Sequence, residues 1–193
     1  MSSTSSGRGP AASILKVARI GHPVVRAAAR PVSDAEIASP DFQRLLDDMV
    51  VTMHEYEGVG LAAPQIHVPL RVAVIEVPAS NERSHAAVPL TILVNPVVTP
   101  LADERVRGWE GCLSVPGLRG VVTRFARLRL EARDREGRPY AAEASGFFAR
   151  VIQHECDHLD GKVYLDRMEG LRTLSFLPEL RRFRPDTEGD EED

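Results

Sequence analysis

Residues 153–158 read Gln-His-Glu-Cys-Asp-His, an H-E-x-x-H element inside an apolar-rich segment that runs from Phe147 to Leu159. Two histidines four positions apart on a helix project from the same face, so the imidazoles of His154 and His158 can bind one metal ion. At roughly 100° per residue, Glu155 lies beside that face and can act on a water at the ion. The element therefore predicts a helix that carries two metal ligands and a base. It also requires a third protein ligand from elsewhere in the chain.

The best candidate for the third ligand is Cys112, in the stretch Glu110-Gly111-Cys112-Leu113-Ser114. A glycine precedes it and the turn Pro116-Gly117 follows, so we expect the thiol to point into a cleft. One thiolate with two imidazoles suits Zn²⁺ or Fe²⁺ better than Mg²⁺ or Ca²⁺. Three protein ligands leave one position open for water, which is typical of a catalytic site. Cys156 lies roughly 200° from His154 on the helical wheel, so we expect it in the core.

Other interpretations of these residues remain open at this point. Cys112 as a nucleophile beside a histidine base would leave the H-E-x-x-H spacing unexplained. A chance match would bury polar groups between Val151, Ile152 and Leu159 without a partner, which is costly. A structural metal site would need a fourth ligand, and no second cysteine lies nearby in the sequence. A zinc endopeptidase would need a further ligand downstream, for which Asp166 and Glu169 are the candidates.

Composition predicts one globular domain. A chain of 193 residues, 43% hydrophobic and 27% charged, is sufficient for a single core. The net charge of −4 comes partly from the acidic end, Asp186 to Asp193, so the remainder offers no footprint for nucleic acid or an anionic membrane. No apolar run reaches the ~20 residues that cross a bilayer.

The predicted domain organisation has three parts: a disordered N-terminal segment over 1–13, a single catalytic domain over 14–183, and an acidic disordered tail over 184–193. Met1 to Pro10 lacks the apolar region of a secretory signal, although Arg8 and the absence of acids leave a weak organelle-targeting interpretation. The two cysteines are interpreted as thiols. We therefore expect a cytoplasmic protein.

The apolar periodicity predicts an α+β fold, with antiparallel sheets packed around a central metal-binding helix and with an N-terminal helix. The helices are predicted over Pro40–Tyr56, over Ser145–Gly161 and, broken by Pro178, over Met168–Phe183. The strands are predicted over Arg71–Val77, Thr91–Asn95, Val97–Leu101 paired with Arg105–Trp109, and Val121–Arg133 paired with Tyr140–Ala144 around a turn at Asp134–Gly137. Ile14–Val17 is expected as a short strand or an extended segment that fixes the N-terminus.

Three histidines outside the metal element are not interpreted as ligands. His22 belongs to a turn, His54 to the last turn of a helix, and His85 to a polar surface loop over 78–89. The stretch Gly58-Val59-Gly60-Leu61-Ala62-Ala63-Pro64-Gln65 is small and apolar and ends in one amide. Taken alone, it is a tight connection between a helix and a strand, because glycine permits unusual backbone angles.

Together, three stretches resemble the signature motifs of the peptide deformylases and occur in the order found in that family. These stretches are Gly58 to Gln65, Glu110 to Ser114 and Gln153 to His158. The segment from Gly21 to Val32 also resembles the N-terminal part of the family, so the similarity covers about residues 14 to 170. The H-E-x-x-H element alone is shared with many metalloproteases, whereas the three motifs together are specific.

The resemblance implies a hydrolase that removes the formyl group from the N-terminal formyl-methionine of nascent polypeptides and releases formate. It implies metal ligation by Cys112, His154 and His158, with Glu155 as the proton carrier. It assigns stabilisation of the developing oxyanion to the Gln65 side chain and the Leu113 backbone N–H. Fe²⁺ is the ion that the family favours, while Zn²⁺, Ni²⁺ and Co²⁺ also suit the ligands. The partners implied are formyl-methionyl nascent chains, with the enzyme at or near the ribosome.

The remaining implied residues bind the substrate or support a ligand. A pocket for the methionine side chain is expected from Val59, Phe147, Val151 and the aliphatic part of Arg150. Gly60 and Gly111 are also expected to bind substrate, and Arg119 is expected to contact the peptide backbone or its end. Glu110 and Arg124 are expected behind the ligands, with the carboxylate orienting an imidazole, or else as a plain surface ion pair.

Overall fold

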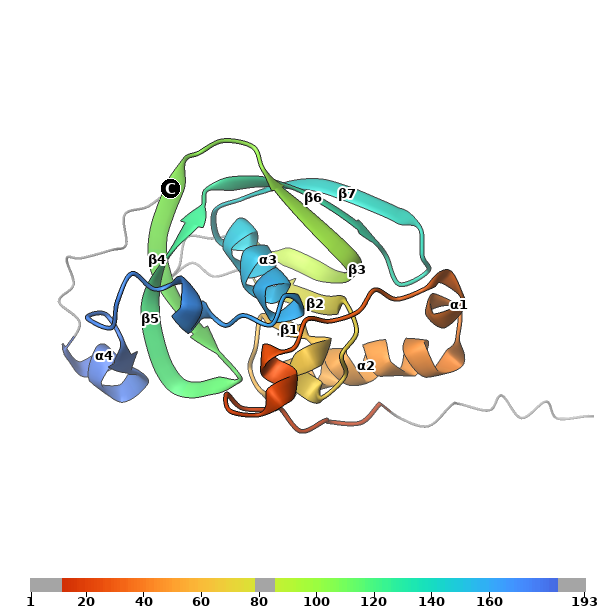
Figure 1. Cartoon of the computed structure of the whole chain (residues 1–193), viewed down its shortest axis with the longest axis horizontal. Coiled ribbons are helices and arrows are strands. Elements are labelled where there is room, and N and C mark those ends of the chain that lie inside the picture. The colour runs from red at the N-terminus through yellow and green to blue at the C-terminus, as the bar shows by residue number, and fades with distance from the viewer. Residues whose placement is uncertain (1–11, 79–85, 184–193) are drawn as a thin grey trace, which may run out of the picture.

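The structure, a computed structural model, describes residues 12–78 and 86–183 (Figure 1). The predicted disorder of residues 1–13 and 184–193 falls almost entirely outside these ranges, as does His85, and stays a prediction. The described part contains no helix that is both long and apolar enough to span a membrane.

Two antiparallel sheets form the framework, as expected for an α+β fold. One is five-stranded, in the order β1 (Gly60–Ala62), β2 (Val72–Val77), β3 (Val88–Pro100), β6 (Arg127–Arg133) and β7 (Pro139–Ser145). The other has the order β4 (Arg105–Cys112), β5 (Val115–Phe125) and β8 (Ser175–Phe176). Every neighbouring pair in both sheets is antiparallel.

Helix α3 (Gly146–Leu159) lies between the long β4–β5 hairpin and the larger sheet (Figure 1). Its apolar side packs Ala149, Ile152 and Cys156 against the strands of the five-stranded sheet. The helix ends before Gly161, whose φ of 72° favours glycine and whose Cβ would come within 2.5 Å of a backbone oxygen. The sheet-facing side of α3 is therefore fixed in the core, and its opposite side is held towards the β4–β5 hairpin.

Helix α2 (Pro40–Glu55) closes the other end of the larger sheet. The Ser39 hydroxyl accepts a hydrogen bond from the Phe42 N–H at 3.2 Å, and Pro40 occupies the first turn, so the start agrees with the predicted helix. Its buried apolar residues, Phe42, Leu46, Met49 and Met53, share a core cluster with β1 and β2. The short helices are α1 (Asp34–Ile37), α4 (Leu177–Phe183), and the 3-10 turns η1 (Pro23–Arg26), η2 (Ala63–Ile66) and η3 (Tyr164–Arg167).

Two strand predictions were wrong. Val97–Leu101 does not pair with Arg105–Trp109: Val97–Pro100 is the end of β3 and pairs with β6. The span Val121–Arg133 is two strands in different sheets, because the chain turns at Ala126 between β5 and β6. Buried positions recur at every second residue on both sides of Ala126, at Val122 and Arg124 and then at Leu128 and Leu130, so the pattern does not reveal where the chain changes sheet.

Near the N-terminal end of the described chain, Ile14–Val17 takes the second of its two expected forms, an extended segment, and leads to Ala18, whose N–H donates to the Gln65 carbonyl at 2.7 Å. The C-terminal end differs from expectation. The predicted helix Met168–Phe183 is instead β8 followed by α4. Pro178 lies in the first turn of α4, where its missing N–H costs nothing, rather than breaking a longer helix.

Candidate active site

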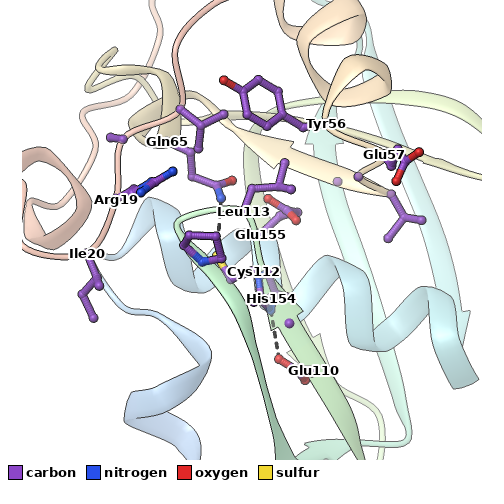
Figure 2. A pocket seen from close by; sticks show the side chains of 18 of the residues that line it. Arg19, Ile20, Tyr56, Glu57, Gln65, Glu110, Cys112, Leu113, His154 and Glu155 are labelled. Carbon is purple, nitrogen blue, oxygen red and sulfur yellow. Dashed lines mark hydrogen bonds and ion pairs between the residues drawn. The ribbon is translucent and has the colours of Figure 1, made fainter. Parts of the chain in front are cut away.

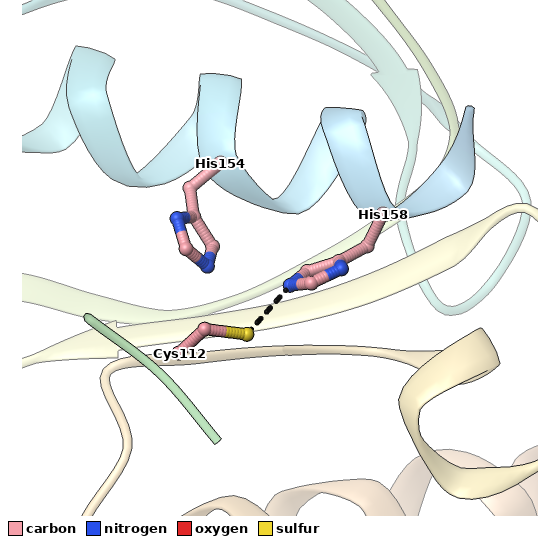
Figure 3. A group of neighbouring side chains, drawn as sticks. All are labelled: Cys112, His154 and His158. Atoms are coloured by element: carbon pink, nitrogen blue, oxygen red, sulfur yellow. Dashed lines mark hydrogen bonds between the residues drawn. The ribbon is translucent and has the colours of Figure 1, made fainter. Parts of the chain in front are cut away.

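The structure brings Cys112, His154 and His158 together, one from the end of β4 and two from α3 (Figure 3). Their ligand atoms all lie within 4.8 Å of one another, and Cys112 Sγ is 3.2 Å from His158 Nε2. The ligands of a tetrahedral zinc, with bonds of about 2.0–2.3 Å, are roughly 3–4 Å apart. The spacing of this group therefore suits one ion of that size.

Cys112 reaches the group because the ladder between β4 and β5 is irregular. The register shifts between Gly111 and Cys112, and Cys112 then pairs with Val115 across a tight turn. Such an irregularity re-aims a side chain. The sulfur accepts hydrogen bonds from the Ser114 N–H at 3.3 Å and the Gln65 amide at 3.5 Å. The thiol thus faces α3 instead of the sheet surface.

The site favours a thiolate. Burial alone would raise the pKa of Cys112, but the imidazoles of His158 and His154 outweigh it and hold that pKa well below its ordinary value. Burial would lower the pKa of His154, and its bonds to Cys112 and Glu110 raise it instead. A deprotonated sulfur beside two imidazoles is the chemistry that a borderline divalent metal requires.

Glu155 lies beside the ligand group and is almost fully buried. Its Oε2 has no hydrogen-bond partner among the described residues, which is unusual for a buried carboxylate oxygen. Burial raises the pKa of Glu155, and the nearby His154 and His158 partly oppose that shift. An orphaned carboxylate oxygen next to three convergent ligands fits a bound ion that carries a water. The residues present therefore suit a catalytic metal.

Glu110 connects the ligands to a buried charge network. Four donors surround its carboxylate: Arg124 Nε and Nη2, each at 2.9 Å, Arg150 Nη1 at 3.0 Å and His154 Nδ1 at 2.9 Å. Burial raises the pKa of Glu110, but the bonds from Arg124 and His154 lower it well below its usual value. The carboxylate accepts from His154 Nδ1, so Nε2 of that ring is left to face the metal position. Glu110 and Arg124 are therefore a buried pair, and the surface ion pair considered as an alternative is wrong.

The network contains charged residues that sequence reasoning missed. Arg124 Nη1 donates to Asp157 Oδ2 at 2.6 Å, and Arg167 also binds Asp157. Arg150 was expected only for its aliphatic part, yet its guanidinium is buried against the β4–β5 hairpin. The available signal was the presence of two further charged residues, Arg150 and Asp157, in the apolar-rich helix that carries the metal element.

Gln65 is buried on η2 with its amide fixed from both ends. Its Oε1 accepts from the Ala62 N–H at 2.9 Å, and its Nε2 is 3.3 Å from Ser114 Oγ. The first contact identifies the amide oxygen, so the NH₂ group points towards Cys112. Gln65 is 2% exposed, so its side chain lies inside the site and is not simply part of a connection between a helix and a strand.

A cavity of about 1300 Å³ adjoins the ligand group. It is lined by all the residues expected to bind substrate, namely Val59, Gly60, Gly111, Arg119, Phe147 and Val151, and by Gln65, Leu113 and Glu155. Arg124 and His158 do not line this cavity. Figure 2 shows Arg19 and Ile20 on the opposite side of Gln65 and Leu113 from Glu57. The N-terminal segment was not expected here, because no sequence pattern reveals that it lies beside the metal helix.

The structure argues against a zinc endopeptidase with a downstream ligand. The Asp166 carboxylate accepts from the Val163 N–H at 2.8 Å and pairs with Arg26. Glu169 binds the Thr123 hydroxyl at 3.0 Å. Neither belongs to the convergent ligand group. Cys112 likewise lies among the metal ligands rather than beside a free histidine base.

Comparison with known proteins identifies the family. The sequence model described as polypeptide deformylase matches residues 14–173. Peptide deformylase 1 of Bordetella pertussis is 45% identical over 85% of this chain and 93% of its own length. Peptide deformylase 2 of Pseudomonas putida is 46% identical over 79% of this chain and 86% of its own.

Solved structures agree with these sequences. The class I type b peptide deformylase from Acinetobacter baumannii bound to Met-Ala-Ser has a TM-score of 0.77 at 35% identity, covering 81% of this chain and 99% of that one. Its actinonin-bound form has a TM-score of 0.72 at 36% identity, covering 82% and 100%. The chain therefore belongs to the peptide deformylases, the metal-dependent hydrolases that remove the N-terminal formyl group from nascent polypeptides.

Proposed function

We propose that Cys112, His154 and His158 hold one divalent ion and that Glu155 carries the proton in deformylation. The observation that carries this proposal is the orphaned Oε2 of Glu155 beside a three-ligand group whose atoms lie within 4.8 Å. Fe²⁺ is the physiological ion implied by the family, and the same sulfur and nitrogen ligands accept Zn²⁺, Ni²⁺ and Co²⁺. When bound, such an ion supplies the Lewis acidity that makes water a nucleophile near neutral pH.

Glu155 moves the proton that the reaction releases. Its carboxylate takes a proton from the attacking water as the water oxygen bonds to the formyl carbon, and returns it to the nitrogen as the C–N bond breaks. The products are formate and a free amino terminus. A carboxylate with a pKa raised by burial suits both steps, because it is a better proton acceptor and still a competent donor.

Gln65 and Leu113 stabilise the negative charge that develops on the formyl oxygen. The Gln65 amide is held by Ala62, which directs its NH₂ group towards the ligands before any substrate binds. Leu113 directly follows the cysteine ligand, so its backbone N–H borders the same position. Donors fixed in advance cost no reorganisation during the reaction, which is why groups of this kind are effective.

The substrate is a formyl-methionyl nascent chain. The methionine side chain enters the part of the cavity lined by Val59, Phe147 and Val151, and Gly60, Gly111 and Arg119 border the peptide backbone. The Arg119 guanidinium lies directly over Gly111, where a Cβ would be 2.3 Å from Cζ, so backbone and cation are close there. The Met-Ala-Ser complex of the Acinetobacter baumannii relative supports an unblocked peptide as product.

Glu110 and Arg124 orient the imidazole of His154, as their buried contacts support. The catalytic domain spans residues 14–183, between a disordered segment over 1–13 and an acidic tail over 184–193. The enzyme acts in the cytoplasm, at the ribosome, where nascent chains carry the formyl group.

The test is formate release from a formyl-Met-Ala-Ser peptide after anaerobic loading of the purified protein with Fe²⁺, Zn²⁺, Ni²⁺ or Co²⁺ in turn. We expect turnover with Fe²⁺ to be the highest. Glu155→Ala should retain the metal and lose turnover, whereas Cys112→Ala should lose the metal. Full activity of Glu155→Ala would refute its role, and cleavage of internal peptide bonds instead of formate release would refute the proposed reaction.

A further inference from the structure

The guanidinium of Arg150 lies at the junction between α3 and the β4–β5 hairpin, one helical turn before His154. Its side chain is only 11% exposed. The groups that accept its hydrogen bonds are the carbonyls of Val106 (2.9 Å), Gly108 (3.3 Å) and Val122 (3.0 Å) and the Oε1 atom of Glu110 (3.0 Å). One side chain of the helix thus binds both strands of the hairpin and the carboxylate that holds His154.

This junction matters because the three ligands come from two separate elements. Cys112 is the last residue of β4, and His154 and His158 belong to α3. The distance between Cys112 Sγ and the two imidazoles therefore depends on how the hairpin packs against the helix. Val106, Gly108 and Glu110 alternate along β4 towards Cys112, and Arg150 contacts all three.

We propose that Arg150 is a positioning residue for the metal site, which seats the β4–β5 hairpin on α3 and so fixes the distance between Cys112 and the two histidines. The inference rests on the proposed function only in taking Cys112, His154 and His158 as the ligands. Arg150 acts through the backbone and through Glu110.

Arginine is the residue type that this junction requires. A guanidinium presents donors in a rigid plane, so it can bind carbonyls on two strands and a carboxylate at once. A lysine ammonium is a compact charge on a flexible stem and cannot span the same set of acceptors. Arg150→Lys keeps the charge and the aliphatic part that lines the cavity, and removes the multiple attachment.

Gly108 provides the space for the guanidinium. A Cβ at this position would lie 2.8 Å from both Cζ and Nη2 of Arg150 and 3.1 Å from Nε. The φ angle of Gly108 is not in the positive range, and the three atoms nearest to the added Cβ all belong to Arg150, so the main strain of an alanine there is on this contact. Gly108→Ala therefore displaces the guanidinium without changing any charged group, which gives an independent perturbation of the same junction.

The primary test compares Arg150→Lys and Arg150→Met with Arg127→Met, which removes an arginine from an exposed ion pair with Glu143. The Co²⁺ form of each protein is prepared, and its thiolate-to-metal absorption band and the rate of Co²⁺ release to a chelator are recorded. Loss of a residue that supports metal ligands typically weakens metal binding 10–100-fold. We expect roughly 10-fold or greater weakening and a shifted band for both Arg150 variants, and neither change for Arg127→Met.

The metal-free proteins separate positioning from general stability. If Arg150 only held the fold together, its variants would unfold at lower denaturant concentration but would bind Co²⁺ with the original spectrum and release rate. That result would overturn the proposal. If Arg150→Met fails to fold, Arg150→Lys and Gly108→Ala decide by the same measurements.

Gly108→Ala supplies the coupling test. In the wild-type background we expect it to speed Co²⁺ release as the Arg150 variants do. In the Arg150→Met background it should have no further effect, because the clash partner is absent. Additive effects would show that the two residues act separately and would also overturn the proposal. None of these measurements uses a formyl peptide. Failure of this proposal can therefore be distinguished from failure of the proposed deformylase activity, which is measured by formate release.

Discussion

Gly60 leaves room for the carboxylate of Glu155. A Cβ at Gly60 would lie 2.3 Å from Oε1 of Glu155 and 2.8 Å from Cδ, and Glu155 is buried. The absence of a side chain at Gly60 therefore lets Glu155, the proposed proton carrier, keep its position. This contact explains why a glycine precedes Leu61 in β1.

We predict that Gly60→Ala lowers kcat for formate release by roughly 10²-fold, because general acid–base catalysis of that order depends on the position of the carboxylate. Metal content should be unchanged, since the three atoms nearest to the added Cβ belong to Glu155 and none belongs to a ligand side chain. Steady-state kinetics and metal analysis of the same sample test this. In a Glu155→Gln background the substitution should add little, and an undiminished kcat for Gly60→Ala alone would contradict the argument.

Gln65 offers a second prediction at the same scale. Gln65→Leu removes the amide NH₂ near Cys112 but keeps the approximate volume of a buried side chain. Loss of one oxyanion donor typically costs about 3–4 kcal/mol, or on the order of 10²–10³ in kcat. The measurement is formate release beside the bound-metal ratio. Ser114→Ala keeps the amide and removes only one of the two contacts that fix it, so it should cost less than Gln65→Leu. Normal turnover of Gln65→Leu would exclude Gln65 from the reaction.

Residue type and spacing were sufficient to predict the ligand group, since a helix fixes where His154 and His158 point and Cys112 is one of only two cysteines in the chain. The buried partners of Glu110 were harder to identify. Arginine and aspartate are common on solvated helix faces. Only the position of the β4–β5 hairpin shows that the charges of Arg150 and Asp157 are enclosed. Their role depends on contacts between segments far apart in the sequence.

At the scale of elements, the short helix α1 was not predicted, although its start is well specified. The Ser33 hydroxyl accepts from the Glu36 N–H at 3.3 Å, and the Glu36 carboxylate accepts from the Ser33 N–H at 2.9 Å, forming a capping box. Arg30 Nη2 donates to the same carboxylate at 2.6 Å. The hydrogen bond from Arg30, followed by those from Ser33, lowers the pKa of Glu36 from 4.5 to about 2.

This shift predicts a pH dependence of stability. A carboxyl whose pKa is lower in the folded protein stabilises it above the unfolded pKa, and that contribution fades as the pH falls from about 4.5 towards about 2. We therefore expect Glu36→Gln to destabilise the protein near neutral pH and the difference from wild type to shrink below pH ~4.5. The free energy of unfolding of the metal-free protein is measured by denaturant titration at several pH values, with Asp103→Asn as an exposed control. A difference that stays constant with pH would contradict the assignment.

The strands show the limit of pattern reasoning at this scale. The turn at Asp134–Gly137 was predictable because its residues favour a turn and the flanking strands pair locally, as β6 and β7 do. The end of β3 and the break at Ala126 could not be predicted in this way, because strands that follow one another in the sequence enter different sheets there. Local alternation encodes which face of a strand is buried, whereas the choice of partner is decided by the whole fold.

For the molecule as a whole, the ligand group joins two bodies of secondary structure. Cys112 closes the β4–β5 hairpin, and α3 belongs to the core of the larger sheet. A metal bound by residues from both would bind the folded protein far better than the unfolded chain, so its binding energy adds to stability. The ion should therefore stabilise the assembly of the hairpin on the helix as well as act in the reaction.

We predict that removing the metal lowers Tm substantially. A ligand present at 1,000 times its Kd contributes about 4 kcal/mol to folding. At roughly 2–4 °C per kcal/mol for a chain of this size, Tm should fall by about 8–16 °C after chelation. Calorimetry with and without Zn²⁺ or Co²⁺ measures the shift, and Cys112→Ala, which loses a ligand, should show a much smaller one. Equal melting of the loaded and chelated protein would mean that the three side chains do not hold an ion across the junction.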